Sequence, residues 1–266
     1  MALQKVKLGG VEVSRLAIGG NCFSGFSHQG DQRDRAMRGY YTTARIKEAL
    51  HKAEAAGINT FFGRTDNHVI RMLEEYWREG GKIQWFAQTA SEHKDPLANI
   101  GQAAACGAKG VYVHGGEVDY WWFNNQKDMI GKCLEKMRAA KLAAAGFAAH
   151  RCEAHEFIRD TLQPDFQCCC YYDPSVRSNS PDHVVSEHEK FDPAHRDQMA
   201  KVIGSLKTPA VHYKVLAAGR TPVEEAFGYA ARVMRPRDVM MVGFYLGDDP
   251  DLIGKTARLF EQIVQK

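Results

Sequence analysis

The stretch Gly107-Ala-Lys-Gly-Val-Tyr-Val-His114-Gly-Gly decides how this chain is interpreted. It predicts a short buried strand over residues 111–113 that ends in a histidine and a pair of glycines. In barrels built from alternating strands and helices, catalytic residues lie at the carboxyl ends of the strands. The glycines allow a sharp turn and let a ligand approach the backbone. His114 is therefore the first candidate for a catalytic residue, the alternative being a structural histidine in the core.

The pattern of a short apolar strand followed by a helix repeats on both sides of this stretch. Seven further segments predict strands, at 16–20, 58–62, 83–87, 143–148, 166–171, 210–215 and 239–244. The helices expected between them have apolar residues spaced along one face. These helices cover residues 43–56, 66–79, 95–107, 126–140, 153–162, 192–206, 221–233 and 250–264. Long loops are expected at 21–41 and 173–191.

Eight strands in alternation with eight helices predict an α/β fold, because such units form a parallel sheet covered by helices and close into a (β/α)8 TIM barrel. An N-terminal β-hairpin is expected before it, since residues 5–13 alternate apolar and polar side chains around Gly9-Gly10. An open doubly wound sheet is the alternative, but no G-x-G-x-x-G follows the first strand. Residues 1–266 are expected to form a single domain.

Composition narrows the functional classes. A net charge of +3 without a basic block argues against a nucleic-acid partner, and no apolar run is long enough to predict a membrane span. The N-terminal residues lack the apolar core of a signal peptide. Seven cysteines, three of them consecutive at 168–170, suit a buried strand better than a disulfide framework. A reduced, cytoplasmic protein with a small-molecule substrate is expected.

Several strings resemble the aldo-keto reductase superfamily, and the resemblance covers nearly the whole chain. They are KVKLGGVEVSRLAIGGNCFSG, GINTFFGRTDNH, GVYVHGG, PDFQCCCYYDP and VHYKVLAAGR. The resemblance implies a carbonyl reductase that uses a tyrosine acid, a lysine, an aspartate and a histidine. Only the histidine, His114, matches. The aspartate position falls on Phe62 or Gly63, the tyrosine position on Asn67 or His68, and the lysine position on Gln88 or Thr89.

The resemblance also implies a site for NADP(H) or NAD(H), which is only partly retained. Gln167 matches the glutamine beneath the nicotinamide, and Tyr213 matches the aromatic side chain that stacks on it. Lys255 is the nearest cation for a 2′-phosphate in the last helix. Asp248 and Asp249 stand where the family has a basic loop, and they would repel a phosphate.

Other polar residues at strand ends are candidates for replacing the missing chemistry. His68, Lys214 and Tyr172 join His114 as candidate catalytic residues. Lys214 is interpreted as a Schiff-base nucleophile or general base, or as a side chain that reaches solvent. Histidines with a carboxylate invite a divalent metal, and the candidate ligands are His114, His150 and Glu117. Trp121-Trp122-Phe123 could stack on a sugar, and His183 and His188 are expected to be solvated.

Three functional hypotheses follow. The leading one is non-reductive chemistry on a small carbonyl or sugar-like substrate, of the isomerase, epimerase, lyase or hydrolase type, assisted by His114 with or without a metal. The first alternative is an NAD(P)H-dependent reductase in which His68 or a nearby tyrosine supplies the proton. The second is a non-catalytic binding protein that keeps the barrel. The register of the second strand stays open, and it decides whether Asn67 or His68 faces the barrel mouth.

Overall fold

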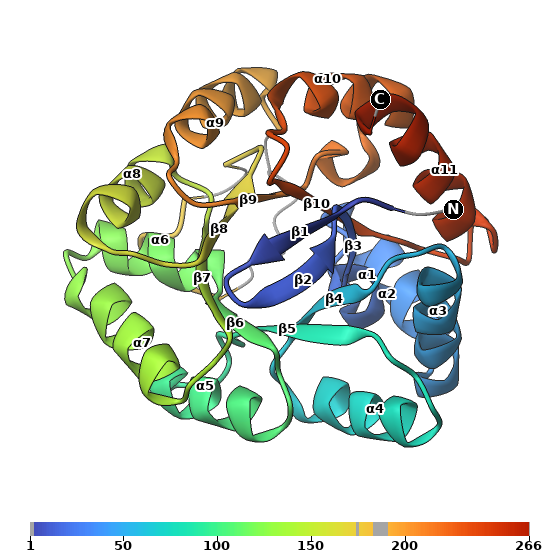
Figure 1. Cartoon of the computed structure of the whole chain (residues 1–266), viewed down its shortest axis with the longest axis horizontal. Coiled ribbons are helices and arrows are strands. Elements are labelled where there is room, and N and C mark those ends of the chain that lie inside the picture. The colour runs from blue at the N-terminus through green and yellow to red at the C-terminus, as the bar shows by residue number, and fades with distance from the viewer. Residues whose placement is uncertain (1–2, 174–175, 183–190, 266) are drawn as a thin grey trace.

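Eight parallel strands form the centre of the computed structural model, which describes residues 3–173, 176–182 and 191–265. They are β3 (Leu16–Gly19), β4 (Thr60–Arg64), β5 (Gln84–Gln88), β6 (Gly110–Val113), β7 (Ala144–Ala149), β8 (Phe166–Cys170), β9 (Ala210–Tyr213) and β10 (Val239–Gly243). The sheet closes in the order β10-β3-β4-β5-β6-β7-β8-β9, as Figure 1 shows from the end of the barrel. This confirms the predicted (β/α)8 barrel.

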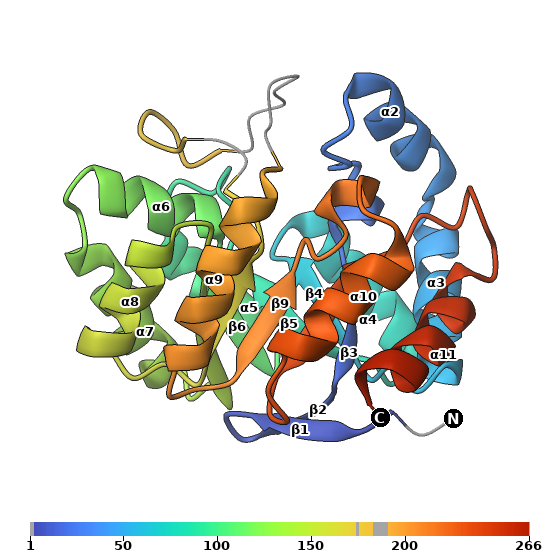
Figure 2. The same ribbon diagram turned by 90° about the horizontal axis from the view of Figure 1, so that it is seen from above.

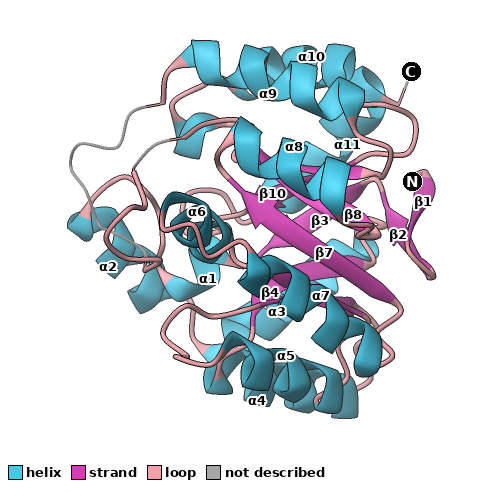
Figure 3. Cartoon of the chain, turned by 90° about the vertical axis from the view of Figure 1, so that its left-hand side faces the viewer, coloured by secondary structure: helices cyan, strands magenta, loops and turns pink. Residues whose placement is uncertain are grey.

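Helices surround the barrel on its outside (Figure 3). They are α3 (Thr43–Ala55), α4 (Asn67–Arg78), α5 (Pro96–Ala105), α7 (Asp128–Ala139), α8 (Cys152–Thr161), α9 (Pro193–Ser205), α10 (Val223–Val233) and α11 (Leu252–Val264). Aspartate side chains at the N-caps determine where several of these helices begin. The Asp66 carboxylate accepts a hydrogen bond from the Val69 amide (2.8 Å), and Asp95 and Asp192 cap helices that start with proline. None of the helices in the described part of the chain is both long and apolar enough to cross a bilayer.

An antiparallel hairpin, β1 (Lys5–Leu8) and β2 (Val11–Ser14), lies across the amino-terminal end of the barrel (Figure 2). Its turn requires glycine at position 9, where φ is +56° and a Cβ atom would lie 2.5 Å from the Ala143 carbonyl oxygen. Leu8 and Val13 are fully buried in the core of the barrel. The predicted hairpin is confirmed, and because it covers this end, a ligand has access at the opposite end.

Aromatic side chains fill the barrel interior. The ring centroids of Phe62 and Phe86 are 5.1 Å apart, and those of Phe86 and Phe166 are 5.6 Å apart. Tyr112 and Cys168 belong to the same buried cluster. Because successive side chains on a strand alternate between the two faces, this cluster identifies which positions of each strand face inward.

Two segments differ from the expectation of loops. Residues 21–41 contain α1 (Asn21–Ser24) and α2 (Asp31–Tyr40), and residues 115–123 form α6 (Gly115–Phe123). The sequence of α2 has no apolar stripe, but buried Asp34 holds it by accepting a hydrogen bond from the Ser27 amide (2.8 Å). In α6, Trp121 is buried and the Trp122 ring packs 5.6 Å from Phe157, so both tryptophans take part in packing. His183 and His188 lie outside the described residues.

Candidate active site

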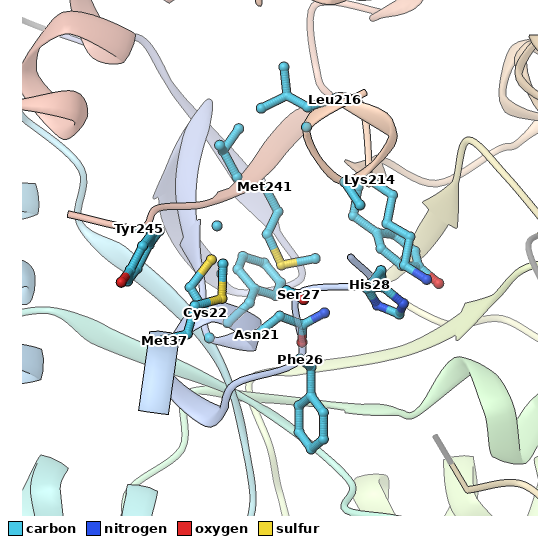
Figure 4. A pocket seen from close by; sticks show the side chains of 18 of the residues that line it. Asn21, Cys22, Phe26, Ser27, His28, Met37, Lys214, Leu216, Met241 and Tyr245 are labelled. Carbon is cyan, nitrogen blue, oxygen red and sulfur yellow. The ribbon is translucent and has the colours of Figure 1, made fainter. Parts of the chain in front are cut away.

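A pocket of about 290 Å³ opens at the carboxyl ends of the barrel strands. It is bordered by residues from β3, β4, β5, β6, β9 and β10, from the ends that follow β6 and β7, and from the segment between α1 and α2. In Figure 4, Lys214 and His28 lie at one side of the pocket, and Cys22, Met37 and Tyr245 lie at the other. The pocket wall therefore combines cationic, apolar and sulfur-containing side chains.

A buried histidine–carboxylate pair forms part of the pocket wall. His150, which follows β7, places its Nδ1 atom 2.7 Å from Oδ2 of Asp119 on α6. The backbone amides of His150 and Arg151 also donate to Asp119, which fixes the carboxylate. Burial, partly offset by these amides, raises the pKa of Asp119 to about 6. Since a carboxylate only accepts hydrogen bonds, His150 carries its proton on Nδ1 and Nε2 is the basic nitrogen.

His114 lies at the end of β6, as the sequence predicted, and is partly buried in the same pocket. Its backbone amide donates to Oγ1 of Thr89 (2.9 Å), and the Thr89 hydroxyl in turn donates to the buried Glu117 carboxylate. Nδ1 of His114 is buried without a hydrogen-bond partner among the described residues. Burial first, and then the charges of Arg64, His150, Arg177 and Lys214, hold the pKa of His114 well below its usual range. A neutral imidazole results, which can donate one hydrogen bond to a substrate oxygen.

Tyr213 and Lys214 reach the pocket from the end of β9. The Tyr213 hydroxyl lies 3.3 Å from the Ala149 carbonyl oxygen, and its ring centroid is 6.0 Å from that of His150. Lys214 has a left-handed backbone with φ of +56°, which is unusual for a residue with a side chain. Such strain gathers at functional sites. The lysine is part of the pocket wall, as Figure 4 shows, and its role as a nucleophile or base stays a prediction.

The other two predicted catalytic residues do not reach the pocket. His68 lies on the exposed first turn of α4, where Nε2 is 3.3 Å from the Thr43 hydroxyl. Tyr172 is buried against Phe191, with ring centroids 5.4 Å apart. The expectation that His68 or Tyr172 acts at the barrel mouth is therefore wrong. For the second strand, the inward register places Phe62 in the core and Arg64 at the pocket.

The residues expected to hold a nicotinamide cofactor do not fit that role together. Gln167 lies between the inward-facing Phe166 and Cys168, so it faces outward, where Oε1 is 2.8 Å from Nδ1 of buried His155. Lys255 is exposed and pairs with Asp249 (2.6 Å) rather than lining the pocket. Of the three expected residues, only Tyr213 borders the pocket. The assignments of Gln167 and Lys255 to a cofactor site are thus wrong.

The predicted metal ligands are not assembled either. His114 and His150 share the pocket, but Glu117 is turned away from it to Thr89, and the Nδ1 atom of His150 is used by Asp119. Within residues 3–173, 176–182 and 191–265, no group of three or more His, Cys, Asp or Glu side chains is placed to hold a metal ion. Burial raises the pKa of Glu117 to about 7, in keeping with a carboxyl that donates or accepts within the fold.

Three residues of the site were missed by sequence reasoning. Asp119 was hidden because no helix was predicted over residues 115–125, and it is α6 that brings Asp119 next to His150. Arg64 follows the second strand and Arg177 follows the sixth, and both line the pocket. Arg64 stands two residues after the predicted strand 58–62, and this position was the signal that could have identified it. Arg177 lies six residues beyond the predicted strand 166–171 and carried no comparable signal.

Comparison with known proteins supports the fold. No family model matches the chain, and no curated protein matches it in sequence. Among solved structures, a protein assigned to the aldo-keto reductases from Pseudomonas aeruginosa shares 14% identity at a TM-score of 0.63, covering 98% of this chain and 94% of its own. An aldo-keto reductase from Bacillus halodurans in its holo form shares 12% identity at a TM-score of 0.60, covering 99% and 95%. A truncated 3-deoxy-D-arabino-heptulosonate 7-phosphate synthase from Thermotoga maritima shares 14% at 0.55, covering 99% and 90%.

At these identities the likeness concerns the fold and not the chemistry. The synthase matches almost as well as the reductases do, although its named activity is different. Function must therefore be argued from the side chains of the pocket. The chain has the (β/α)8 fold with an N-terminal hairpin, and this fold is similar to that of the aldo-keto reductases.

Proposed function

We propose that this protein catalyses non-reductive proton transfer on a small carbonyl or sugar-like substrate, as an isomerase, epimerase or lyase does. The observation that carries the proposal is the buried contact of 2.7 Å between His150 Nδ1 and Asp119 Oδ2 in the pocket wall. A carboxylate that fixes the tautomer of a histidine makes the other ring nitrogen a positioned general base. The positions where aldo-keto reductases carry their acid, lysine and aspartate hold other residues here.

The proposed step removes a proton from the carbon next to a substrate carbonyl. His150 accepts the proton at Nε2, and Asp119 stabilises the imidazolium that forms. The electron pair of the C–H bond moves into the carbonyl, so that negative charge develops on its oxygen. Neutral His114 donates a hydrogen bond to this oxygen, and the positive charge of Lys214 stabilises it. Return of the proton to the same carbon completes an epimerisation. An isomerisation is completed when the proton goes instead to the former carbonyl carbon, while the hydroxyl proton of the neighbouring carbon passes to the enolate oxygen and leaves a new carbonyl there.

Proton exchange with solvent tests the proposal directly. The protein is incubated in D2O with a panel of small hydroxy-aldehydes, hydroxy-ketones and their phosphate or carboxylate derivatives, and deuterium incorporation is followed by NMR. We expect enzyme-dependent incorporation next to the carbonyl of at least one substrate, without added nucleotide. NADPH and NADH are titrated in parallel by fluorescence. Tight nucleotide binding, together with reduction of a carbonyl and no exchange, would contradict the proposal and favour the reductase alternative.

Gly115 gives a prediction about how closely the site is packed. A Cβ atom at this position would lie 3.0 Å from Cε1 of His150 and 3.1 Å from the hydroxyl of Tyr213. Gly115→Ala is therefore expected to displace the His150 ring and to lower the exchange rate at least about tenfold, because catalytic geometry tolerates little displacement. Gly131→Ala is the matched control, since Gly131 lies in α7 with nothing within 4 Å of its added methyl group. It should leave the rate unchanged; an equal loss in both variants would contradict the role of Gly115.

A further inference from the structure

The pocket has a strong imbalance of charge. Among the described residues that line it, the cationic side chains are Arg33, Arg64, Arg177 and Lys214, and Asp248 provides the one carboxylate. That carboxylate is already engaged, because Asp248 Oδ1 accepts a hydrogen bond from Arg33 (3.0 Å). The other cations that line the pocket are Arg64, Arg177 and Lys214, and each of them influences His114.

Arg177 is the most informative of these cations. Only 3% of it is exposed, and its Nε atom is buried without a hydrogen-bond partner in the described residues. Its guanidinium donates to the backbone carbonyl of Asp182, and it makes no ion pair with a described carboxylate. A buried guanidinium without a counter-charge is costly, and an anionic ligand would offset that cost.

Arg64 is held in place by contacts that leave it at the pocket wall. Its guanidinium pairs with Glu92, lies near Asp66 (3.7 Å), and stacks 5.1 Å from the ring centroid of Phe26. Glu92 is about half exposed, so solvent weakens its compensation of the buried arginine. The arginine is 8% exposed and already ordered, which lowers the entropy that binding an anion would cost.

The three cations all influence the same residue, His114. Each of Arg64, Arg177 and Lys214 contributes to the lowering of the pKa of His114, although they come from different parts of the chain. Positive charge is thus concentrated around the end of β6, where the proposed reaction takes place. Lys214 approaches it from the strained end of β9.

We infer that the substrate carries an anionic group, a phosphate or a carboxylate, bound by Arg64 and Arg177 together with Lys214. The inference rests on the proposed function, because the anionic group would place the carbonyl against His114 and His150. Guanidinium groups suit this task, since they present paired N–H donors to the oxygens of a phosphate or carboxylate. A neutral substrate of the same shape would leave the buried Arg177 with no counter-charge from residues 3–173, 176–182 and 191–265.

Titration of the full chain with inorganic phosphate, followed by calorimetry and by NMR of the histidine ring signals, tests the inference. We expect saturable binding at millimolar concentration that weakens as salt is raised. Arg177→Gln and Arg64→Gln should each weaken it about tenfold or more, as expected for loss of a charged hydrogen-bond partner. Arg177→Lys, which keeps the charge, should retain part of the affinity. Acetate is titrated in parallel to distinguish carboxylate from phosphate recognition.

Arg71→Gln is the matched control, because Arg71 lies exposed on α4 and its substitution makes the same change of net charge. Phosphate affinity that is equal in wild type, Arg64→Gln and Arg177→Gln, or that falls equally in Arg71→Gln, would overturn the inference. The Asp119→Asn variant separates the anion-binding inference from the proposed function. This change is expected to abolish the basicity of His150 Nε2, but it removes none of the cations. Phosphate binding without proton exchange on any substrate would contradict only the proposed function. Proton exchange on neutral substrates without phosphate binding would contradict only the inference that Arg64, Arg177 and Lys214 bind an anionic group.

Discussion

Asp119→Asn is expected to lower the rate of substrate proton exchange about 10⁴-fold, the size of effect seen when an aspartate that orients a catalytic histidine becomes an amide. The amide oxygen can still accept hydrogen bonds from the backbone amides of His150 and Arg151. The amide nitrogen, however, would donate to Nδ1 of His150, which shifts the ring proton to Nε2. The base is then lost while the fold is kept, and the melting temperature should change by only a few degrees.

The rate of substrate proton exchange should fall in acid. Burial raises the pKa of Asp119 to about 6, so the carboxylate that orients His150 is present above this pH and is lost below it. The exchange rate of the wild type should therefore fall as pH drops through about 6. This acid limb should be absent from the residual activity of Asp119→Asn.

Asp173→Asn is the control for Asp119→Asn. Asp173 is also a partly buried acid, and it lies 3.6 Å from Arg151, next to the site but outside the pocket lining. The Asp173→Asn variant should exchange substrate protons at nearly the wild-type rate. An Asp119→Asn rate within threefold of wild type, or an equal loss in Asp173→Asn, would show that His150 does not depend on Asp119.

The barrel could be predicted from the sequence because each helix and strand carried its own signal. Short apolar strands alternated with helices whose apolar residues recur on one face, and aspartates marked helix starts, as Asp66 does for α4. The missed helices lacked such signals. The sequence of α2, DQRDRAMRGY, buries only Asp34 and Met37. For α6, the initial glycines Gly115 and Gly116 resembled a turn. In the structure they begin a helix that is preceded by His114 and carries the buried Asp119.

The site was harder to predict than the fold because buried strands do not show which side faces inward. Every residue of Phe166–Cys170 is buried, so apolar–polar alternation is absent and Gln167 could be assigned to either face. The structure resolves this through Phe166 and Cys168, which belong to the interior cluster. The resemblance to aldo-keto reductases pointed to His114, which lines the pocket in the structure. It gave no indication of Asp119, because none of the strings that carry the resemblance includes residue 119.

Asp238→Asn is expected to destabilise the fold by about 3–5 kcal/mol, the cost of removing one partner from a buried ion pair. Asp238 is fully buried at the start of β10, and its carboxylate accepts hydrogen bonds from Arg235 (2.8 Å) and from the Ala210 amide (2.8 Å). Nε2 of His212 lies 3.3 Å away, and Nδ1 of His212 lies 3.0 Å from the Tyr171 hydroxyl. An amide cannot balance the Arg235 charge, so the melting temperature should fall by on the order of 10 °C.

Lowering the pH should also weaken the hydrogen-bond network of Asp238 and His212. The pKa shifts of both residues predict that stability falls in acid. Burial acts to raise the pKa of Asp238, but hydrogen bonds from His212 and Arg235 outweigh it, and the net pKa lies below the usual value. The stability that the carboxylate contributes is present above its unfolded pKa of about 4 and is lost as pH falls below it. Burial lowers the pKa of His212, so its neutral form stabilises the fold above about pH 6.5 and this contribution is lost on acidification.

Asp160→Asn provides the comparison, because it removes an aspartate that also pairs with an arginine (Arg159, 2.7 Å) but on the surface. Solvent screens an exposed pair, so the melting temperature of Asp160→Asn should stay within a few degrees of wild type. Thermal unfolding of both variants and wild type at pH 7 and pH 4 is the measurement. The stability gap between wild type and Asp238→Asn should narrow as pH falls toward and below 4, because the unfolded chain then binds a proton at Asp238 that the folded chain does not. Equal losses for Asp160→Asn and Asp238→Asn at pH 7, or a gap that widens in acid, would show that the buried carboxylate does not stabilise the fold as an ion.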